Sequence, residues 1–270
     1  MTAITARRRH PAAGYVVVLI GLLVVGTIYA VITGGPVASA ASATLSPSSQ
    51  IAWGKSIFDK NCSSCHGLMA QGIPGIAPPL IGVGAAAVDF QVSTGRMPLA
   101  GPGAEGVRKP PVLSTAEAHA VAAYIESLAG GPAIPTAAQV SQVGANVGMG
   151  QQLFVADCAQ CHNFVGAGGA LTYGKFAPPL TSSTPTQIYE AMLTGPEAMP
   201  VFNNTTITPQ AKRDIIAYVI QTRNEPNPGG FSLGRIGPVT EGLVAFLGLL
   251  LFMVFAALWL TAKHGKTTHD

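Results

Sequence analysis

The chain has 270 residues and a formal net charge of +3, with 48% apolar and only 10% charged residues. The length allows one or two compact domains, and so few charges are unusual for a wholly soluble protein. Between residues 51 and 225, nine Lys and Arg are matched by ten Asp and Glu. This balance excludes a strongly basic body that would be steered onto nucleic acid or acidic partners.

The first apolar segment runs from residue 14 to 32, 19 residues without a charge or a proline. As a helix it would measure about 28 Å, close to the hydrocarbon thickness of a bilayer. Arg7, Arg8 and Arg9 precede it, which predicts that the tail 1–13 is cytoplasmic. A cleaved signal peptide is the alternative, because Ala38-Ser39-Ala40 resembles a cleavage site. The run is longer than a usual signal core, so we expect a retained transmembrane helix. Residues 33–50, rich in Ala, Ser, Gly and Thr, are typical of a flexible tether.

The second apolar segment, 242–262, has 21 uncharged residues. Lys263 and Lys266 follow it in the tail 263–270, which predicts a cytoplasmic C-terminus. A buried core helix is the alternative, and the length and the basic flank argue against it. With both termini cytoplasmic, the chain is predicted to cross the cell membrane twice and to place its middle part outside the cytoplasm.

That middle part contains the pattern C-x-x-C-H twice, as Cys62 to His66 and as Cys158 to His162. The pattern is the attachment signature of a c-type haem. Two thiols three positions apart can each form a thioether with one vinyl group of the same porphyrin. The histidine that follows is then held under the iron. The sequence therefore predicts two covalent haem c groups, and their attachment uses every cysteine of the chain: Cys62, Cys65, Cys158 and Cys161.

Three other uses of such cysteines are a structural zinc site, a thioredoxin-like redox pair and disulfides. A zinc site needs no histidine directly after the second cysteine and would usually bring the two pairs within a few tens of residues. A redox pair predicts no Met-Pro downstream, yet Met97-Pro98 and Met199-Pro200 follow the two motifs. Both observations favour haem.

Residues 51–131 and 148–225 are two copies of one unit, joined by a linker at 132–147 and followed by another at 226–241. Four paired features define the repeat: Gly54 to Phe58 with Gly150 to Phe154, Ala77 to Leu80 with Ala177 to Leu180, Met97-Pro98 with Met199-Pro200, and Tyr124 with Tyr218. The largest difference is Gly101 to Val112, which is extra in the first copy.

Each copy is predicted to begin and end in a helix. Ser114 with Glu117 forms the pattern of a capping box, and this helix should run to about Leu128. Thr208-Pro209 supplies an N-cap and a proline at the first helical position of a helix to about Thr222.

The opening helix of each copy places a glycine and a phenylalanine four residues apart on one face. We expect Gly54 and Gly150 to permit close approach of the closing helices that carry Tyr124 and Tyr218. The middle of each copy is rich in Gly and Pro with little periodicity and would be a poor core alone. An apolar macrocycle would supply that core.

The order helix, C-x-x-C-H, Pro-Leu loop, Met-Pro and final helix resembles the class I cytochrome c fold, twice over. With its two apolar helices, the whole chain resembles the dihaem cytochrome c (cytochrome cc) subunit of the actinobacterial cytochrome bc complex, a menaquinol–cytochrome c reductase. The resemblance covers nearly the entire chain. It implies an all-α fold of two tandem class I cytochrome c domains flanked by N- and C-terminal transmembrane helices.

The resemblance also implies the axial ligands of the two irons. His66 and His162 match the proximal positions, and Met97 and Met199 match the distal ones. A thioether opposite an imidazole favours Fe(II) and fills the sixth coordination position, so such a centre passes electrons and contains no catalytic residue. Met192 competes with Met199, but the repeat alignment favours Met199.

Pro78 and Pro178 have two interpretations. The family's proline packs near the histidine and its carbonyl orients the ring, whereas a proline at this place could simply turn the loop. Both remain open from the sequence.

By resemblance, the chain relays electrons from the Rieske iron–sulfur protein, beside cytochrome b, towards the copper centre of a terminal oxidase in a supercomplex. It would be the electron-transfer subunit of a quinol–cytochrome c reductase (translocase) and itself make or break no substrate bonds. One alternative is a dihaem subunit of another membrane complex, a cbb-type oxidase or a dehydrogenase. A dihaem peroxidase needs an open distal site, which two Met-Pro segments argue against, and a haem sensor needs a signalling domain that the chain lacks.

Overall fold

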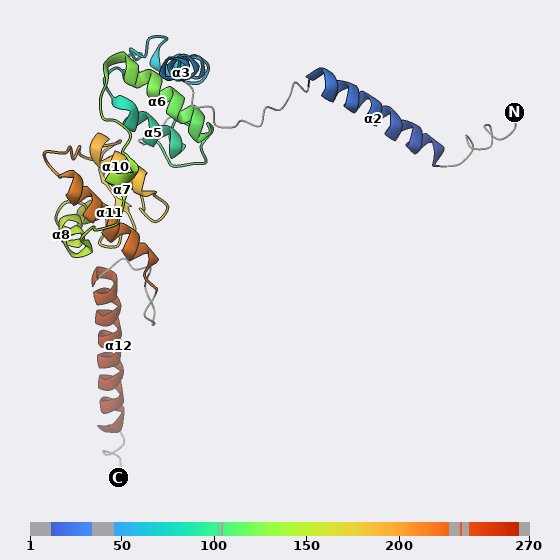
Figure 1. Ribbon diagram of the computed structural model, residues 1–270. Coiled ribbons are helices and arrows are strands. Elements are labelled where there is room, and N and C mark those ends of the chain that lie inside the picture. Colours follow the sequence, from blue (N-terminus) through green and yellow to red (C-terminus); the bar gives the residue numbers. More distant parts are fainter. Residues whose placement is uncertain are drawn as a thin grey trace, which may run out of the picture. The chain divides into compact units, whose positions relative to one another are not determined.

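The structure is a computed structural model that describes residues 12–33, 46–101, 103, 105–226, 233 and 238–264. Its described part is mostly helical (Figure 1). The predicted tails 1–13 and 263–270, the tether and the linker 226–241 lie largely outside the described residues. The chain divides into two units, Met1–Ser46 and Pro47–Asp270.

Helix α2, Ala13–Thr33, forms where the first apolar run predicts a helix. The part of α2 whose side chains the structure describes, Ala13–Tyr29, is apolar throughout but falls short of the roughly 18 residues that mark a membrane span. Of the helices described, α12, Pro238–His264, is the one long and apolar enough to cross a membrane, over Thr240–Ala262. Its side chains are exposed, Phe252 by 69%, as expected of a helix whose solvent is lipid.

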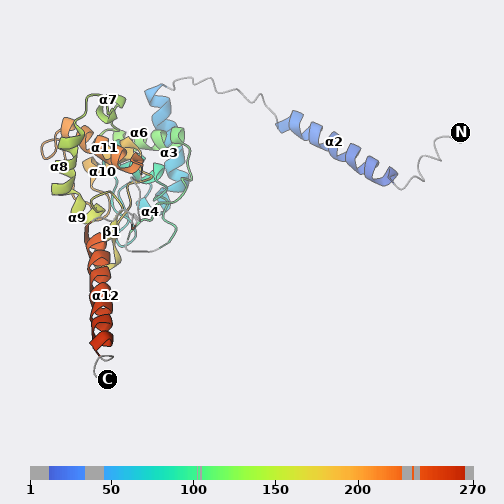
Figure 2. The same cartoon turned by 90° about the horizontal axis from the view of Figure 1, so that it is seen from below.

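The first copy contains helices α3 (Pro47–Asn61), α4 (Ser63–His66), α5 (Gly84–Ser93) and α6 (Thr115–Ala129), which Figure 2 shows beside the second copy. Helix α3 crosses α6 at Gly54, where a Cβ atom would overlap the Ala120 carbonyl. The Phe58 ring packs on Tyr124 with 5.3 Å between centroids. The predicted close approach at Gly54 is confirmed.

The second copy repeats this crossing with helices α8 (Val147–Asp157), α9 (Ala159–His162), α10 (Pro185–Thr194) and α11 (Pro209–Asn224). A Cβ at Gly150 would overlap the Asp214 carbonyl, and Phe154 packs on Tyr218 at 5.3 Å. The same two residue types therefore set the same helix crossing in both copies.

The helix caps follow the sequence patterns. Ser114 and Glu117 form the full capping box of α6, which ends at Ala129. The Thr208 hydroxyl accepts from the Ala211 amide, with Pro209 at the first helical position of α11.

Other elements depart from the predictions. The middle of each copy contains a ten-residue helix, α5 or α10, where little periodicity was found. A short helix α7, Ala137–Val140, lies in the predicted linker 132–147, and α3 begins at Pro47, inside the predicted tether. Strands β1 (Gly169–Ala170) and β2 (Phe176–Ala177) form a small antiparallel ladder that an all-α fold does not include.

Helices α5 and α10 pack against one another and join the two copies. At this contact the fully buried Glu190 carboxyl of α10 lies beside Asp89 of α5, and both Glu190 oxygens and the Asp89 Oδ1 are buried without a hydrogen-bond partner. Burial, and then the neighbouring Asp89 carboxylate, raise the pKa of Glu190 to about 10. His119 of α6 also approaches Asp89, with its Nε2 3.5 Å from the Asp89 Oδ1. The Glu190 carboxyl is therefore protonated at neutral pH and can share its proton with Asp89.

Glu190→Gln should stabilise the folded protein at pH 8 by about 2 kcal/mol or more. Folding raises the pKa of Glu190 from 4.5 to about 10, so the folded state favours the protonated carboxyl. This preference stabilises the protein fully below about pH 4.5 and is lost as the pH rises towards 10, because the unfolded chain then gains by ionising. An amide copies the protonated carboxyl and removes this loss. Chemical unfolding at pH 5 and pH 8 measures the change, with Glu225→Gln on the exposed end of α11 as control. An equal effect of Glu190→Gln at both pH values would contradict the protonated pair.

Candidate functional site

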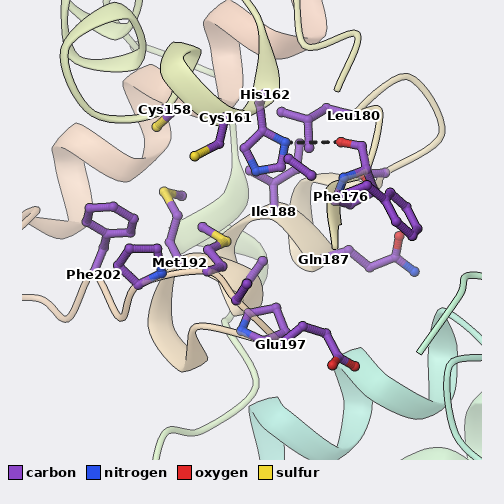
Figure 3. A pocket seen from close by; sticks show the side chains of 18 of the residues that line it. Cys158, Cys161, His162, Phe176, Leu180, Gln187, Ile188, Met192, Glu197 and Phe202 are labelled. Atoms are coloured by element: carbon purple, nitrogen blue, oxygen red, sulfur yellow. Dashed lines mark hydrogen bonds between the residues drawn. The ribbon is translucent and has the colours of Figure 1, made fainter. Parts of the chain in front are cut away.

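The second C-x-x-C-H motif lies at one side of a deep cleft (Figure 3). Cys158 ends helix α8, where its amide donates to the Phe154 carbonyl, and the next residues turn at once into the short helix α9. This turn brings Cys158, Cys161 and His162 to the same wall of the cleft. The cleft has an empty volume of about 1200 Å³, part of it open to solvent, and Met199 also lines it. The structure thus brings all four predicted site residues of the second copy together.

The imidazoles of both motifs are oriented in the same way. The Nδ1 atom of His66 lies 2.9 Å from the Pro78 carbonyl oxygen, and that of His162 lies 3.0 Å from the Pro178 oxygen. A carbonyl can only accept a hydrogen bond, so Nδ1 carries the proton and donates, and Nε2 is left with a free lone pair for a metal. Of the two interpretations of these prolines, the structure supports the one in which the carbonyl orients the ring. Burial lowers the pKa of His162, which favours the neutral, ligating form.

The four thiols are free, and the environment of two of them argues against a thioredoxin-like redox pair. Burial raises the pKa of Cys62 to about 11 and that of Cys158 to about 12. A reactive redox pair needs a thiolate, which a lowered pKa provides. In the part of the chain that the structure describes, no three His, Cys, Asp or Glu side chains converge as a metal site would require.

The methionines lie beside the motifs. In the second copy both Met192 and Met199 line the cleft; Met192 is fully buried on α10, and Met199 lies in the loop that follows. In the first copy Met97 and Cys62 both pack against the core that contains Phe58, and His66 is buried. Haem c needs two thiols for attachment to the porphyrin, and an imidazole and a thioether as ligands of the iron. The residues gathered here supply all four groups and so fit that cofactor.

The sequence interpretation missed a wall of the second cleft, which comes from the first copy. Its residues are Phe90, Arg96, Glu105, Gly106 and Arg108. The Arg108 guanidinium donates to the Ser182 carbonyl and to the Gln187 Oε1, each at 3.1 Å. The Phe176 amide donates to Glu105 at 2.9 Å, and the Gly106 amide donates to Glu197 at 3.2 Å. The one sequence signal was the extra segment 101–112 in the first copy, which contains three of these wall residues.

Both copies match families of c-type cytochromes. Residues 51–129 match the family described as cytochrome c, and residues 145–219 match the family described as cytochrome c oxidase, cbb3-type, subunit III. Each range overlaps one of the two copies that the repeat defines.

Relatives that match over nearly the whole chain identify a more specific family than the two domain matches do. A protein of Mycobacterium tuberculosis is 43% identical over 262 residues, which cover 95% of this chain and 93% of the relative. A protein of Corynebacterium diphtheriae is 41% identical over 276 residues, covering 96% and 98%, and one of Mycobacterium leprae is 43% identical over 250 residues, covering 91% and 86%. Each is named cytochrome bc1 complex cytochrome c subunit.

Identity at this level over nearly the full length of both partners confirms the resemblance found from the motifs. The cytochrome c domains imply haem c, and an apolar C-terminal helix provides a candidate membrane anchor. The chain belongs to the family of cytochrome c subunits of the cytochrome bc1 complex, an electron-transferring oxidoreductase.

Proposed function

We propose that the chain binds two haem c groups, one in each copy, within domains 51–131 and 148–225. Cys62 and Cys65 would attach the first, and Cys158 and Cys161 the second. The observation that carries this proposal is the set of thiols, oriented imidazole and thioether gathered in the second cleft, whose sequence pattern the first copy repeats. A haem bound there supplies a one-electron Fe(III)/Fe(II) couple.

His66 and Met97 would cap one iron, and His162 and Met199 the other. The backbone carbonyls of Pro78 and Pro178 hold the two imidazoles in the tautomer that can ligate. Met97→Ala and Met199→Ala should each remove the near-infrared methionine–iron charge-transfer band of one haem. Persistence of both bands in either variant would exclude that methionine as a ligand.

The chain would relay electrons from the Rieske iron–sulfur protein of the complex, beside cytochrome b, towards the copper centre of a terminal oxidase. The family supports the first partner, and the presence of two redox units in one chain supports a relay over some distance. Tethering raises the effective concentration of a neighbouring site, so a nearly neutral ectodomain needs no long-range steering.

We propose that both apolar helices, 14–32 and 242–262, cross the cell membrane, with the haem domains outside and both termini in the cytoplasm. The arginines before the first helix and the lysines after the second support this orientation. The chain would then act as the anchored electron-transfer subunit of a proton-translocating quinol–cytochrome c reductase.

A second candidate function is that of a dihaem subunit of a cbb3-type oxidase, which the match of residues 145–219 favours. That match covers the second copy alone, whereas the bc1 relatives cover more than nine-tenths of the chain. The bc1 complex is therefore the better supported assembly.

Purification of the full chain in mild detergent, through a tag on Asp270, tests this assignment. We expect cytochrome b and the Rieske protein to copurify in equal amounts, together with oxidase subunits that contain a copper centre. A matched chain that ends at Pro226, without α12, should lose these partners if that helix is an anchor. Recovery of cbb3-type oxidase or dehydrogenase subunits without cytochrome b would contradict the proposal.

A further inference from the structure

The side chain of Arg96 is a buried cation with an unsatisfied donor. It is only 6% exposed, and its Nη1 atom is buried without a hydrogen-bond partner. The guanidinium stacks 4.9 Å from the centre of the Phe90 ring and lines the cleft of the second copy. No carboxylate in the described ranges lies within ion-pair distance of it. A buried charged donor without an acceptor points to an anionic group that is bound in the cleft.

The neighbouring charges do not fill this role. Glu105 and Glu197, the acidic side chains at this wall, accept hydrogen bonds from the Phe176 and Gly106 amides. Arg108 adds a second cation beside Arg96. The charges of Arg96 and Arg108 balance those of Glu105 and Glu197, so this wall has no net negative charge that would repel an anionic group.

The wall lies at the edge of the cleft away from the thiols. Figure 3 shows Gln187 and Glu197 on the far side of the cavity from Cys158 and Cys161. Arg108 is bonded to Gln187, and Gly106 to Glu197, so the extra segment of the first copy approaches that far edge. In a haem, the propionates occupy the edge opposite the vinyl groups that form the thioethers. A haem held through Cys158 and Cys161 would direct its carboxylates towards this wall.

We propose that Arg96 and Arg108 of the first copy bind the propionate carboxylates of the haem that is attached to the second copy. The inference rests on the proposed function, because it requires a haem at Cys158 and Cys161. The first copy then completes the second haem site. Arg96 directly precedes Met97, so one dipeptide would contact both cofactors and hold them at a fixed separation.

Lys109 fixes the extra segment in the position that this arrangement requires. Its ammonium group donates to the carbonyls of Gly95, Arg96 and Pro98, so the segment is folded back onto the backbone around Met97. Arg108 in turn bonds the Ser182 carbonyl and Gln187 of the second copy, so the segment is tied to both copies.

The test compares Arg96→Gln, Arg96→Lys and Arg108→Gln in the full chain. Arg213→Gln is the matched control: it removes a cation of the second copy that bonds the Ser141 and Val143 carbonyls and does not line the cleft. Covalent haem per chain is measured first, and spectroelectrochemical titration of both haems follows. Removal of a cation beside a haem favours Fe(III), so Arg96→Gln should lower the equilibrium constant for reduction of one haem by at least about threefold. Arg96→Lys should restore most of it, and Arg213→Gln should change neither haem.

A map of the haem-loaded complex shows which haem Arg96 contacts. We expect a propionate oxygen of the second haem within hydrogen-bond distance of the Arg96 Nη1. Two covalent haems with unchanged potentials in Arg96→Gln, or propionates of the second haem directed away from Arg96, would overturn the inference and leave the proposed function intact. Fewer than two covalent haems in the unaltered chain would instead contradict the proposed function.

Discussion

Replacement of Cys158 and Cys161 together by serine should leave the chain with one covalent haem in place of two. Serine has no sulfur and so cannot form the thioether to a porphyrin vinyl group, and the chain has no spare thiol. Cys62→Ser with Cys65→Ser should remove the other haem in the same way. Haem-stained gels and the pyridine haemochrome spectrum per mole of chain measure the loss.

The control for this experiment changes the residues between the thiols. Ser63→Ala with Ser64→Ala leaves Cys62, Cys65 and His66 in place and should retain both haems. Two haems after either pair of cysteine replacements would show that the motif is used for something else. Complete loss of both haems from one pair would show that the copies do not mature independently.

Gly150→Ala should destabilise the second copy by at least about 2 kcal/mol, although alanine is the better helix former by about 1 kcal/mol. The added methyl group would overlap the Asp214 carbonyl, which is backbone and can yield only if α8 and α11 move apart. That movement would also separate the Phe154 ring from Tyr218. Gly54→Ala should act in the same way in the first copy, against the Ala120 carbonyl. Thermal unfolding followed by circular dichroism measures both changes.

Gly148→Ala is the matched control, since Gly148 lies in the same helix as Gly150. The nearest atom to a Cβ there is the Asn146 Oδ1 at 3.5 Å, an ordinary contact. Alanine at this position should therefore stabilise the protein by up to about 1 kcal/mol. A similar response to Gly148→Ala and Gly150→Ala would mean that the helix crossing does not depend on close approach.

Local sequence patterns and the internal repeat predicted the opening and closing helices of each copy and the way they cross. Ser114 with Glu117 and Thr208 with Pro209 are caps whose partners lie within four residues, so the sequence alone contains the interaction. The pairing of Gly54 and Phe58 with the helix of Tyr124 was predictable because the second copy repeats the same spacing. The cap of α10, formed by Thr184, Pro185 and Gln187, follows the same kind of local pattern but was not predicted.

The contacts between the copies were not predictable in this way. Asp89 and Glu190 meet only because α5 packs on α10, and neither residue has a counterpart of its own kind in the other copy. Arg96 has no role in the sequence analysis, and the structure shows it 6% exposed in the wall of the second copy's cleft. Such contacts join residues more than 70 positions apart, where no local pattern exists.

This contact between the copies bears directly on function. If two redox centres in one chain exchange electrons, their separation must be held constant. The buried Asp89–Glu190 pair at α5 and α10, and the half-buried hydrogen bonds of the extra segment to Gln187 and Glu197, join one copy to the other. Variants at Arg96 and at Glu190 address the two parts of this junction separately, one through redox potential and the other through the dependence of stability on pH.

The central claim is that this chain holds two haems by covalent bonds. Acid–acetone extraction of the purified full chain, followed by a haemochrome assay of pellet and supernatant, tests it most directly. We expect the colour to remain with the precipitated protein, at two haems per chain. Colour in the supernatant, or a pellet with no haem, would contradict the account.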